Sequence, residues 1–189
     1  LALVTVEGTG MIGVPGPAQR VFGALRQAQV SVVMISQGSS EHSICSVVSE
    51  AQCDAAQQAL EKEFHRELCL ALLQRIKVER DISVLAAVGD AMAGTPGIAA
   101  RLFQSLSHAQ VNVRAIAQGA SERNISVAVG TAESQKALRA IHAGFWLSPQ
   151  TISVGIIGPG NVGAALLEQL CAQIPHLKQH QGIDIRVRA

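Results

Sequence analysis

The chain has 189 residues, of which 48% are hydrophobic and 15% charged, and its mean hydropathy is +0.28. A chain this apolar is not intrinsically disordered, and it can bury a core without disulfides. The net charge of +1, with one Trp and no Tyr, argues against nucleic-acid binding, because both a basic patch and aromatic stacking platforms are lacking.

The chain contains an internal repeat with a spacing of 81 residues. Residues 8–48 and 89–129 align without a gap and share 20 of 41 positions. The most specific match is a Gln-Gly-x-Ser-Glu turn, which occurs at 37–41 and again at 118–122. Two copies are too few for a solenoid, so the repeat predicts a duplicated domain.

The first copy predicts a mixed series of strands and helices. An apolar strand over 3–6 precedes a Gly/Pro loop, and a helix begins near Pro15-Gly16-Pro17. A β-branched strand over 30–35, a polar turn and a returning strand over 44–48 follow. A helix over 51–73 and a short strand over 76–78 complete the copy.

The second copy repeats this order from a strand over 82–88, with a helix at Pro96-Gly97 and a last helix over 133–142. The order β-α-β-β-α-β predicts two ferredoxin-like units, and hence the α+β class. The closing strand of the second copy is not evident. The pattern leaves open whether the strand at 75–79 is exchanged between the copies.

The last 39 residues predict a different fold. An apolar run over 151–157 leads into Gly158-Pro159-Gly160-Asn161-Val162-Gly163, after which apolar residues share one helical face. A Gly-x-Gly-x-x-Gly motif between a strand and a helix is typical of the phosphate-binding turn of a Rossmann domain. The predicted cofactor-binding residues are Gly158, Gly160, Asn161, Val162 and Gly163. A generic glycine-rich turn is the alternative.

Three further features of the C-terminal part of the chain predict neither a binding site nor a membrane span. A second strand is predicted over 183–187, and Asp184 stands at its start, whereas the ribose-binding acid of a Rossmann domain stands at the end of that strand. His176 and His180 lie one helical turn apart without a third ligand, so we predict no metal site. The uncharged stretch 140–167 is broken by prolines and glycines, so we predict no membrane span.

Three segments together resemble the regulatory region of bifunctional aspartokinase–homoserine dehydrogenases. They are Ile35-Ser-Gln-Gly-Ser-Ser-Glu41, Ile116-Ala-Gln-Gly-Ala-Ser-Glu122 and the glycine-rich run from Gly155 to Glu168. In that family tandem ACT domains link an aspartate kinase to an NAD(P)-dependent homoserine dehydrogenase. The resemblance implies side-by-side ACT units over 1–80 and 81–149, and the truncated β-α-β start of a Rossmann domain over 150–189.

The resemblance also implies what this chain does. We expect a piece of a longer enzyme that lacks both catalytic sites and senses an end-product amino acid, threonine before lysine. We further expect a cytoplasmic homo-oligomer that pairs through its ACT units. NAD or NADP is expected in the longer protein, without tight binding to this piece. The four cysteines include no Cys-x-x-Cys pair, which is typical of a reducing compartment.

The residues predicted to bind the effector lie at helix starts and strand ends. A helix N-terminus suits a carboxylate, glycine permits close approach, and a Gln amide offers both a donor and an acceptor. The effector-sensing glutamines of the family match Gln37 and Gln118. The full predicted set is Val14, Gly16, Ala18, Gln37, Gly97, Ala99 and Gln118. Alternatively, the two glutamines only satisfy the backbone of their turns.

The two copies are not identical at their second strands, where Arg114 replaces Val33 and Asn112 replaces Ser31. This difference predicts that the two effector sites are inequivalent. Two other classes of function stay open: a dimerisation module whose effector sites have decayed, and a dehydrogenase half that binds its dinucleotide unaided.

Overall fold

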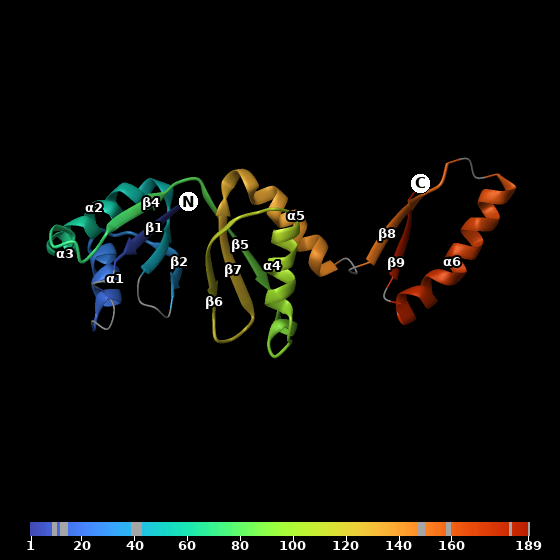
Figure 1. Cartoon of the computed structure of the whole chain (residues 1–189), viewed down its shortest axis with the longest axis horizontal. Helices are drawn as coiled ribbons and strands as arrows, with labels where there is room; N and C mark the ends of the chain where they lie inside the picture. The colour runs from blue at the N-terminus through green and yellow to red at the C-terminus, as the bar shows by residue number, and fades with distance from the viewer. Residues whose placement is uncertain are drawn as a thin grey trace. The chain divides into compact units, whose positions relative to one another are not determined.

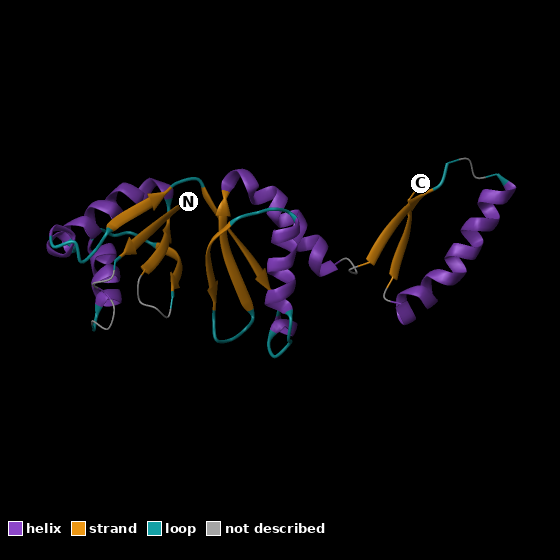
Figure 2. Ribbon diagram, viewed as in Figure 1, coloured by secondary structure: helices purple, strands orange, loops and turns teal. Residues whose placement is uncertain are grey.

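The computed structural model describes residues 1–8, 11, 15–38, 43–146, 150–157, 160–181 and 183–188. It divides into two compact units, one of residues 1–96 and 111–135 and the other of residues 97–110 and 136–189. Strands and helices alternate along most of the chain (Figures 1 and 2). The first copy consists of β1 (Ala2–Glu7), α1 (Pro17–Gln27), β2 (Val32–Gln37), β3 (Ser43–Val48), α2 (Cys53–Glu63), α3 (His65–Cys69) and β4 (Arg75–Glu79).

The remaining elements follow the predicted order. The second copy consists of β5 (Ile82–Val88), α4 (Ile98–His108), β6 (Val113–Gln118), β7 (Asn124–Gly130) and α5 (Ser134–Trp146). The last segment consists of β8 (Gln150–Gly155), α6 (Asn161–Gln181) and β9 (Ile183–Arg188). Short 3-10 turns at Glu50–Gln52, Asp90–Met92 and Thr131–Glu133 lead toward α2, α4 and α5.

The first sheet has the ferredoxin-like strand order β2-β3-β1-β4, and all its pairs are antiparallel. Its fourth strand pairs with β1 of the same copy, with Val4 opposite Val78. The strand at 75–79 is therefore not exchanged between the copies. The described second sheet has three strands in the order β5-β7-β6.

The core of the first copy lies between its sheet and helices α1 and α2. Val21, Ala24 and Leu25 of α1 are buried against it, as the spacing of apolar residues predicts, and Leu60 of α2 is 1% exposed. Full burial of side chains of this size contributes about 1.5–3 kcal/mol each, so the packed helix face is the main stabilising feature of the copy.

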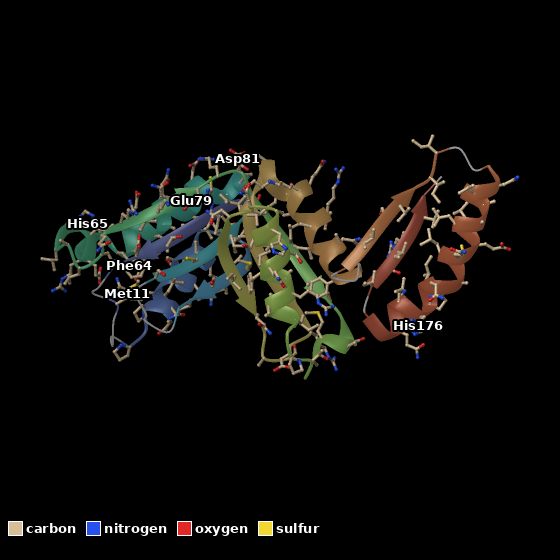
Figure 3. All side chains as sticks on the ribbon, turned by 45° about the vertical axis from the view of Figure 1, so that its right-hand side comes forward. Met11, Phe64, His65, Glu79, Asp81 and His176 are labelled. Atoms are coloured by element: carbon tan, nitrogen blue, oxygen red, sulfur yellow. The ribbon has the colours of Figure 1, made fainter. Side chains whose placement is uncertain are left out.

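The single helix predicted over 51–73 is wrong. Helix α2 ends at Glu63, and Phe64 leaves the helical conformation with φ −102° and ψ 18°. The ring of Phe64 is 2% exposed and belongs to the core, and the Arg20 guanidinium lies 4.4 Å from its centroid. Burying this ring offsets the lost helical turn. Met11, in the same core cluster, lies near it (Figure 3).

An extra residue interrupts the pairing of β2. Val32 lies opposite Val48 and Met34 lies opposite Val47, so Val33 forms a β-bulge. Because side chains alternate along a strand, an extra residue reverses the face of every later side chain. Val32 accordingly packs beneath the helices, whereas Met34 faces the second copy. Strand β6 has the same irregularity at the equivalent position.

The sheets of the two copies pack against each other within the first unit. The cluster between them contains Leu3, Met34, Val47, Ile82, Ala115 and Ala128, with Leu1, Cys45, Val84 and Ala117 partly buried around it. Residues 81 apart recur in this cluster, so each copy presents equivalent positions of its sheet to the other. Such a contact is isologous, like that of a twofold dimer.

The last segment forms a parallel β-α-β unit, because β8 pairs with β9 in parallel and Val154 lies opposite Val187. Strand β8 ends at Gly155, two residues before the predicted end. Helix α6 continues through Pro175, which lies inside it. In the described part of the chain, no helix is long and apolar enough to cross a membrane.

Candidate effector site

Helix α1 begins at a glycine that its conformation requires. Gly16 is the residue before the helix and has φ 93°, a left-handed conformation that strains any other residue. Pro17 follows at the first helical position, where its missing N–H costs no hydrogen bond. No side chain of the described residues caps this end, so the first-turn N–H groups can face a ligand carboxylate.

The bulge in β2 determines where Gln37 points. Gln37 is the last residue of β2 and lies opposite Ile44, whose side chain is in the core beneath the helices. Gln37 therefore faces the helix side of the sheet, toward the start of α1. Without the extra residue Val33, the alternation of the strand would direct Gln37 to the opposite face.

A cavity of about 210 Å³ lies between the start of α1 and the end of β2. Drug-sized ligands occupy cavities of about 300–1,000 Å³, so this one suits a smaller molecule. Three of the predicted effector residues, Gly16, Ala18 and Gln37, line it together. The predicted residue Val14 lies outside the described residues. The full described lining is Met11, Pro15, Gly16, Pro17, Ala18, Gln37 and Ile44.

Four lining residues were absent from the predicted effector set: Pro15 and Pro17, which flank Gly16, and the core residues Met11 and Ile44. Met11 is 4% exposed and Ile44 is 2% exposed, and they form the apolar part of the wall. Both are repeated 81 residues later, as Met92 and Ile125. The identity of the two copies at these positions was the signal that could have singled them out.

Arg20, one turn into α1, is not available to a ligand carboxylate. Its guanidinium donates to Glu63 Oε1 at 2.8 Å, to Glu67 Oε1 at 2.5 Å and to the Glu63 carbonyl at 2.8 Å. The bonds to these carboxylates raise the pKa of Arg20, and the Arg20 hydrogen bond lowers the pKa of Glu67. The cavity therefore offers backbone N–H groups and the Gln37 amide, without a free cation among its described lining residues.

The predicted residues of the second copy are divided between the two units. Gly97 precedes α4 with φ 90°, as Gly16 precedes α1, and Ala99 lies in the first turn of α4. Gln118 ends β6 in the other unit, as Gln37 ends β2. The turn after β6 is fixed by Glu122, whose carboxylate accepts the Gly94 N–H at 2.7 Å.

Arg114, which differs from Val33 of the first copy, pairs with a residue of the first copy. Its Nη1 lies 3.6 Å from Glu79 Oε2, and Lys77 Nζ lies 2.6 Å from the other oxygen of that carboxylate. The Lys77 hydrogen bond and the charge of Arg114 lower the pKa of Glu79. Arg114 thus connects the two copies, at the end of β4 labelled by Glu79 in Figure 3.

The glycine-rich turn is described in part. Helix α6 begins at Asn161, followed by Val162 and Gly163, and the Ala164 N–H donates to the Gly160 carbonyl at 2.9 Å. Gly158 lies outside the described residues. At Gly160, a Cβ would meet no described atom within 4 Å, so the backbone there is open to close approach.

Asp184 is engaged in ion pairs at the start of β9. Its carboxylate accepts from Arg186 Nε at 3.0 Å and lies 3.5 Å from Lys178 Nζ, and the Arg186 hydrogen bond lowers its pKa. These contacts give Asp184 a role in joining α6 to β9. Within the described residues, no group of three His, Cys, Asp or Glu side chains could hold a metal ion.

A duplicated ferredoxin-like unit with a small cavity at a helix start has the architecture of a ligand-binding regulatory domain. A family model described as "ACT domain" matches residues 4–64 and 85–145, two segments that are also offset by 81 residues. The chain belongs to the ACT-domain family.

Known relatives place this ACT pair among the regulatory regions of aspartokinases. It is 50% identical over 187 residues to the chloroplastic bifunctional aspartokinase/homoserine dehydrogenase 2 of Arabidopsis thaliana, covering 99% of this chain and 20% of that protein. It is 30% identical to the regulatory subunit of aspartate kinase from Thermus flavus, with a TM-score of 0.64 over 76% of this chain and 92% of that one. The chain thus spans about a fifth of its bifunctional relative.

A third similarity concerns the fold alone. The structure of E. coli aspartokinase III in complex with lysine and aspartate matches 77% of this chain and 31% of that one, at 24% identity and a TM-score of 0.57.

Proposed function

We propose that this chain is an allosteric regulatory module that binds threonine and thereby controls aspartate kinase and homoserine dehydrogenase activities of a longer protein. The observation that carries the proposal is the 210 Å³ cavity where Gly16, Ala18 and Gln37 meet. Binding that favours one arrangement of the module shifts the attached catalytic domains by a coupling of about 1–3 kcal/mol.

The chemistry of the cavity favours a small, neutral side chain. First-turn N–H groups suit the effector carboxylate, and the Gln37 amide can accept from the ammonium or donate to a hydroxyl. Met11 and Ile44 supply an apolar wall for a methyl group. Lysine is the second candidate, because aspartokinase III was crystallised with it. The described lining residues include no acid to pair with a second ammonium, which supports threonine over lysine.

Oligomerisation and cofactor binding complete the proposal. Strands β2 and β6 are at the edges of their described sheets, and Val33, Ile35 and Ile116 are exposed on them. Homo-oligomers form through these ACT units. In the longer protein the β-α-β unit begins a domain that binds NAD or NADP at Gly160–Gly163. The cytoplasmic location stays a prediction, and the Arabidopsis relative is described as chloroplastic.

Calorimetric titration tests the effector assignment. Threonine is expected to bind saturably at millimolar concentration or below. One neutral hydrogen bond contributes about 1 kcal/mol, so Gln37→Ala should weaken binding roughly fivefold. Gln118→Ala is the matched variant in the second copy, and its effect should differ from that of Gln37→Ala because the two copies differ.

Four results separate the alternatives. If lysine binds saturably and threonine does not, lysine is the effector. Lack of binding by either amino acid, with an intact oligomer, would indicate the dimerisation module. Equal and negligible effects of the two Gln variants would assign the glutamines to turn structure. Tight binding of NADP to this chain alone would instead support the dehydrogenase half.

A further inference from the structure

The two glutamine-bearing strands are connected by one hydrogen bond between the copies. The Ser36 hydroxyl donates to the Ile116 carbonyl at 2.6 Å. Ser36 immediately precedes Gln37 in β2, and Ile116 lies two residues before Gln118 in β6. Alternation along β2 places Ser36 on the face toward the second copy and Gln37 on the face toward the cavity.

We infer that Ser36 is a positioning residue that fixes the end of β2 against the second copy and so holds Gln37 at the effector cavity. This inference rests on the proposed function. Strand β2 is an edge strand of the described sheet and has only β3 as its ladder partner. Edge segments open locally at low free-energy cost, so a bond to the far side of the strand restrains its end. The second copy thereby contributes to the effector site of the first.

The second copy has no equivalent donor that could make the reciprocal bond. The residue equivalent to Ser36 in the second copy is Ala117, which has no hydroxyl to donate. Ala117 lies in the same cluster between the sheets, so the difference occurs within the contact between the copies. The end of β2 supplies the donor, the Ser36 hydroxyl, and the end of β6 supplies the acceptor, the Ile116 carbonyl.

The test compares three serine variants of the whole chain. Ser36→Ala removes the bond, and Ser36→Thr retains the hydroxyl. Ser83→Ala is the matched control, because the Ser83 hydroxyl bonds Thr131 Oγ1 at 3.1 Å in the second copy. Two measurements are made: calorimetric affinity for threonine, and amide hydrogen exchange at residues 35–37 without ligand.

Ser36→Ala should weaken threonine binding about threefold to tenfold, as expected for one hydrogen bond, and should speed exchange at 35–37. Ser36→Thr should leave the threonine affinity and the exchange rate as they are in the unaltered chain. Ser83→Ala should change neither. Unchanged affinity and exchange in Ser36→Ala would overturn the inference while leaving the proposed function standing. If the unaltered chain binds no threonine, the proposed function fails, and exchange at 35–37 alone decides whether Ser36 fixes the strand.

Discussion

Gly8 and Gly89 are equivalent residues of the repeat with different surroundings. A Cβ on Gly8 would lie 2.6 Å from the Leu73 Cα and 2.7 Å from the Leu72 carbonyl oxygen, both backbone atoms. A Cβ on Gly89 would meet only the Met92 side chain, at 3.5 Å from its Cγ. The chain therefore needs glycine at the first position for packing and tolerates a larger residue at the second.

This contrast gives a matched pair of variants. Gly8→Ala should lower the free energy of unfolding by about 1–3 kcal/mol, because the backbone of the α3–β4 connection must move. Gly89→Ala should change it by less than about 0.5 kcal/mol, as surface substitutions usually do. Denaturant unfolding followed by circular dichroism measures both. Equal effects of the two variants would contradict the packing described for Gly8.

The ion pair of Arg20 with Glu67 makes stability depend on pH. Arg20 lowers the pKa of Glu67 in the folded chain, so the unfolded state binds a proton more readily. The stabilisation is present above the ordinary Glu pKa of about 4.3 and is lost as the pH falls through the lowered value. Comparing Glu67→Gln with the unaltered chain should give a difference in thermal midpoint at pH 7 that shrinks below about pH 4.

Glu61→Gln, at an exposed position of α2, is the control for this comparison. A midpoint difference between Glu67→Gln and the unaltered chain that stays constant from pH 7 to pH 3 would contradict the role given to the Arg20 bond.

At the scale of elements, the repeat made most of the fold predictable. The strand over 82–88 has the predicted bounds, and both Gly-initiated helices begin where Pro and Gly indicate. The helix break at Phe64 was not predictable, because the local composition favours helix and only core packing draws the ring inward. The bulge at Val33 also escaped prediction, because a one-residue irregularity leaves the β-branched pattern unchanged.

The contact between the two sheets combines large and small residues. Met34 of the first copy corresponds to Ala115 of the second, and Val47 corresponds to Ala128. If two first copies paired, their methionines would be overpacked, and if two second copies paired, their alanines would leave a void. The side-chain sizes therefore favour the pairing of a first copy with a second copy.

Variants that exchange the large and the small side chain at positions 34 and 115 test this complementarity. Met34→Ala should destabilise the chain by about 2–5 kcal/mol and Ala115→Met by about 1–3 kcal/mol. Because both residues belong to one cluster, the double variant should be destabilised by less than the sum, with a coupling of about 0.5 kcal/mol or more. Strictly additive effects in denaturant unfolding would show that the two positions do not share packing space.

At the scale of the whole molecule, duplication followed by divergence accounts for the main features. Each copy retains a glycine before its first helix and a glutamine at the end of its second strand. The copies diverge at Ser36/Ala117 and Val33/Arg114, where Ser36 and Arg114 now contact the other copy. A pair of similar units has thereby become one asymmetric module, in which each copy makes contacts that the other does not.

Threonine binding in the cavity between α1 and β2 of the first copy is the proposal on which the others depend. The most direct measurement is a titration of the isotopically labelled chain with threonine, followed by amide chemical shifts. We expect saturable shifts at the backbone amides of Gly16 and Ala18 and at the side-chain amide of Gln37. Threonine that leaves these three signals unmoved at millimolar concentration, or that shifts only signals elsewhere, would contradict the proposal.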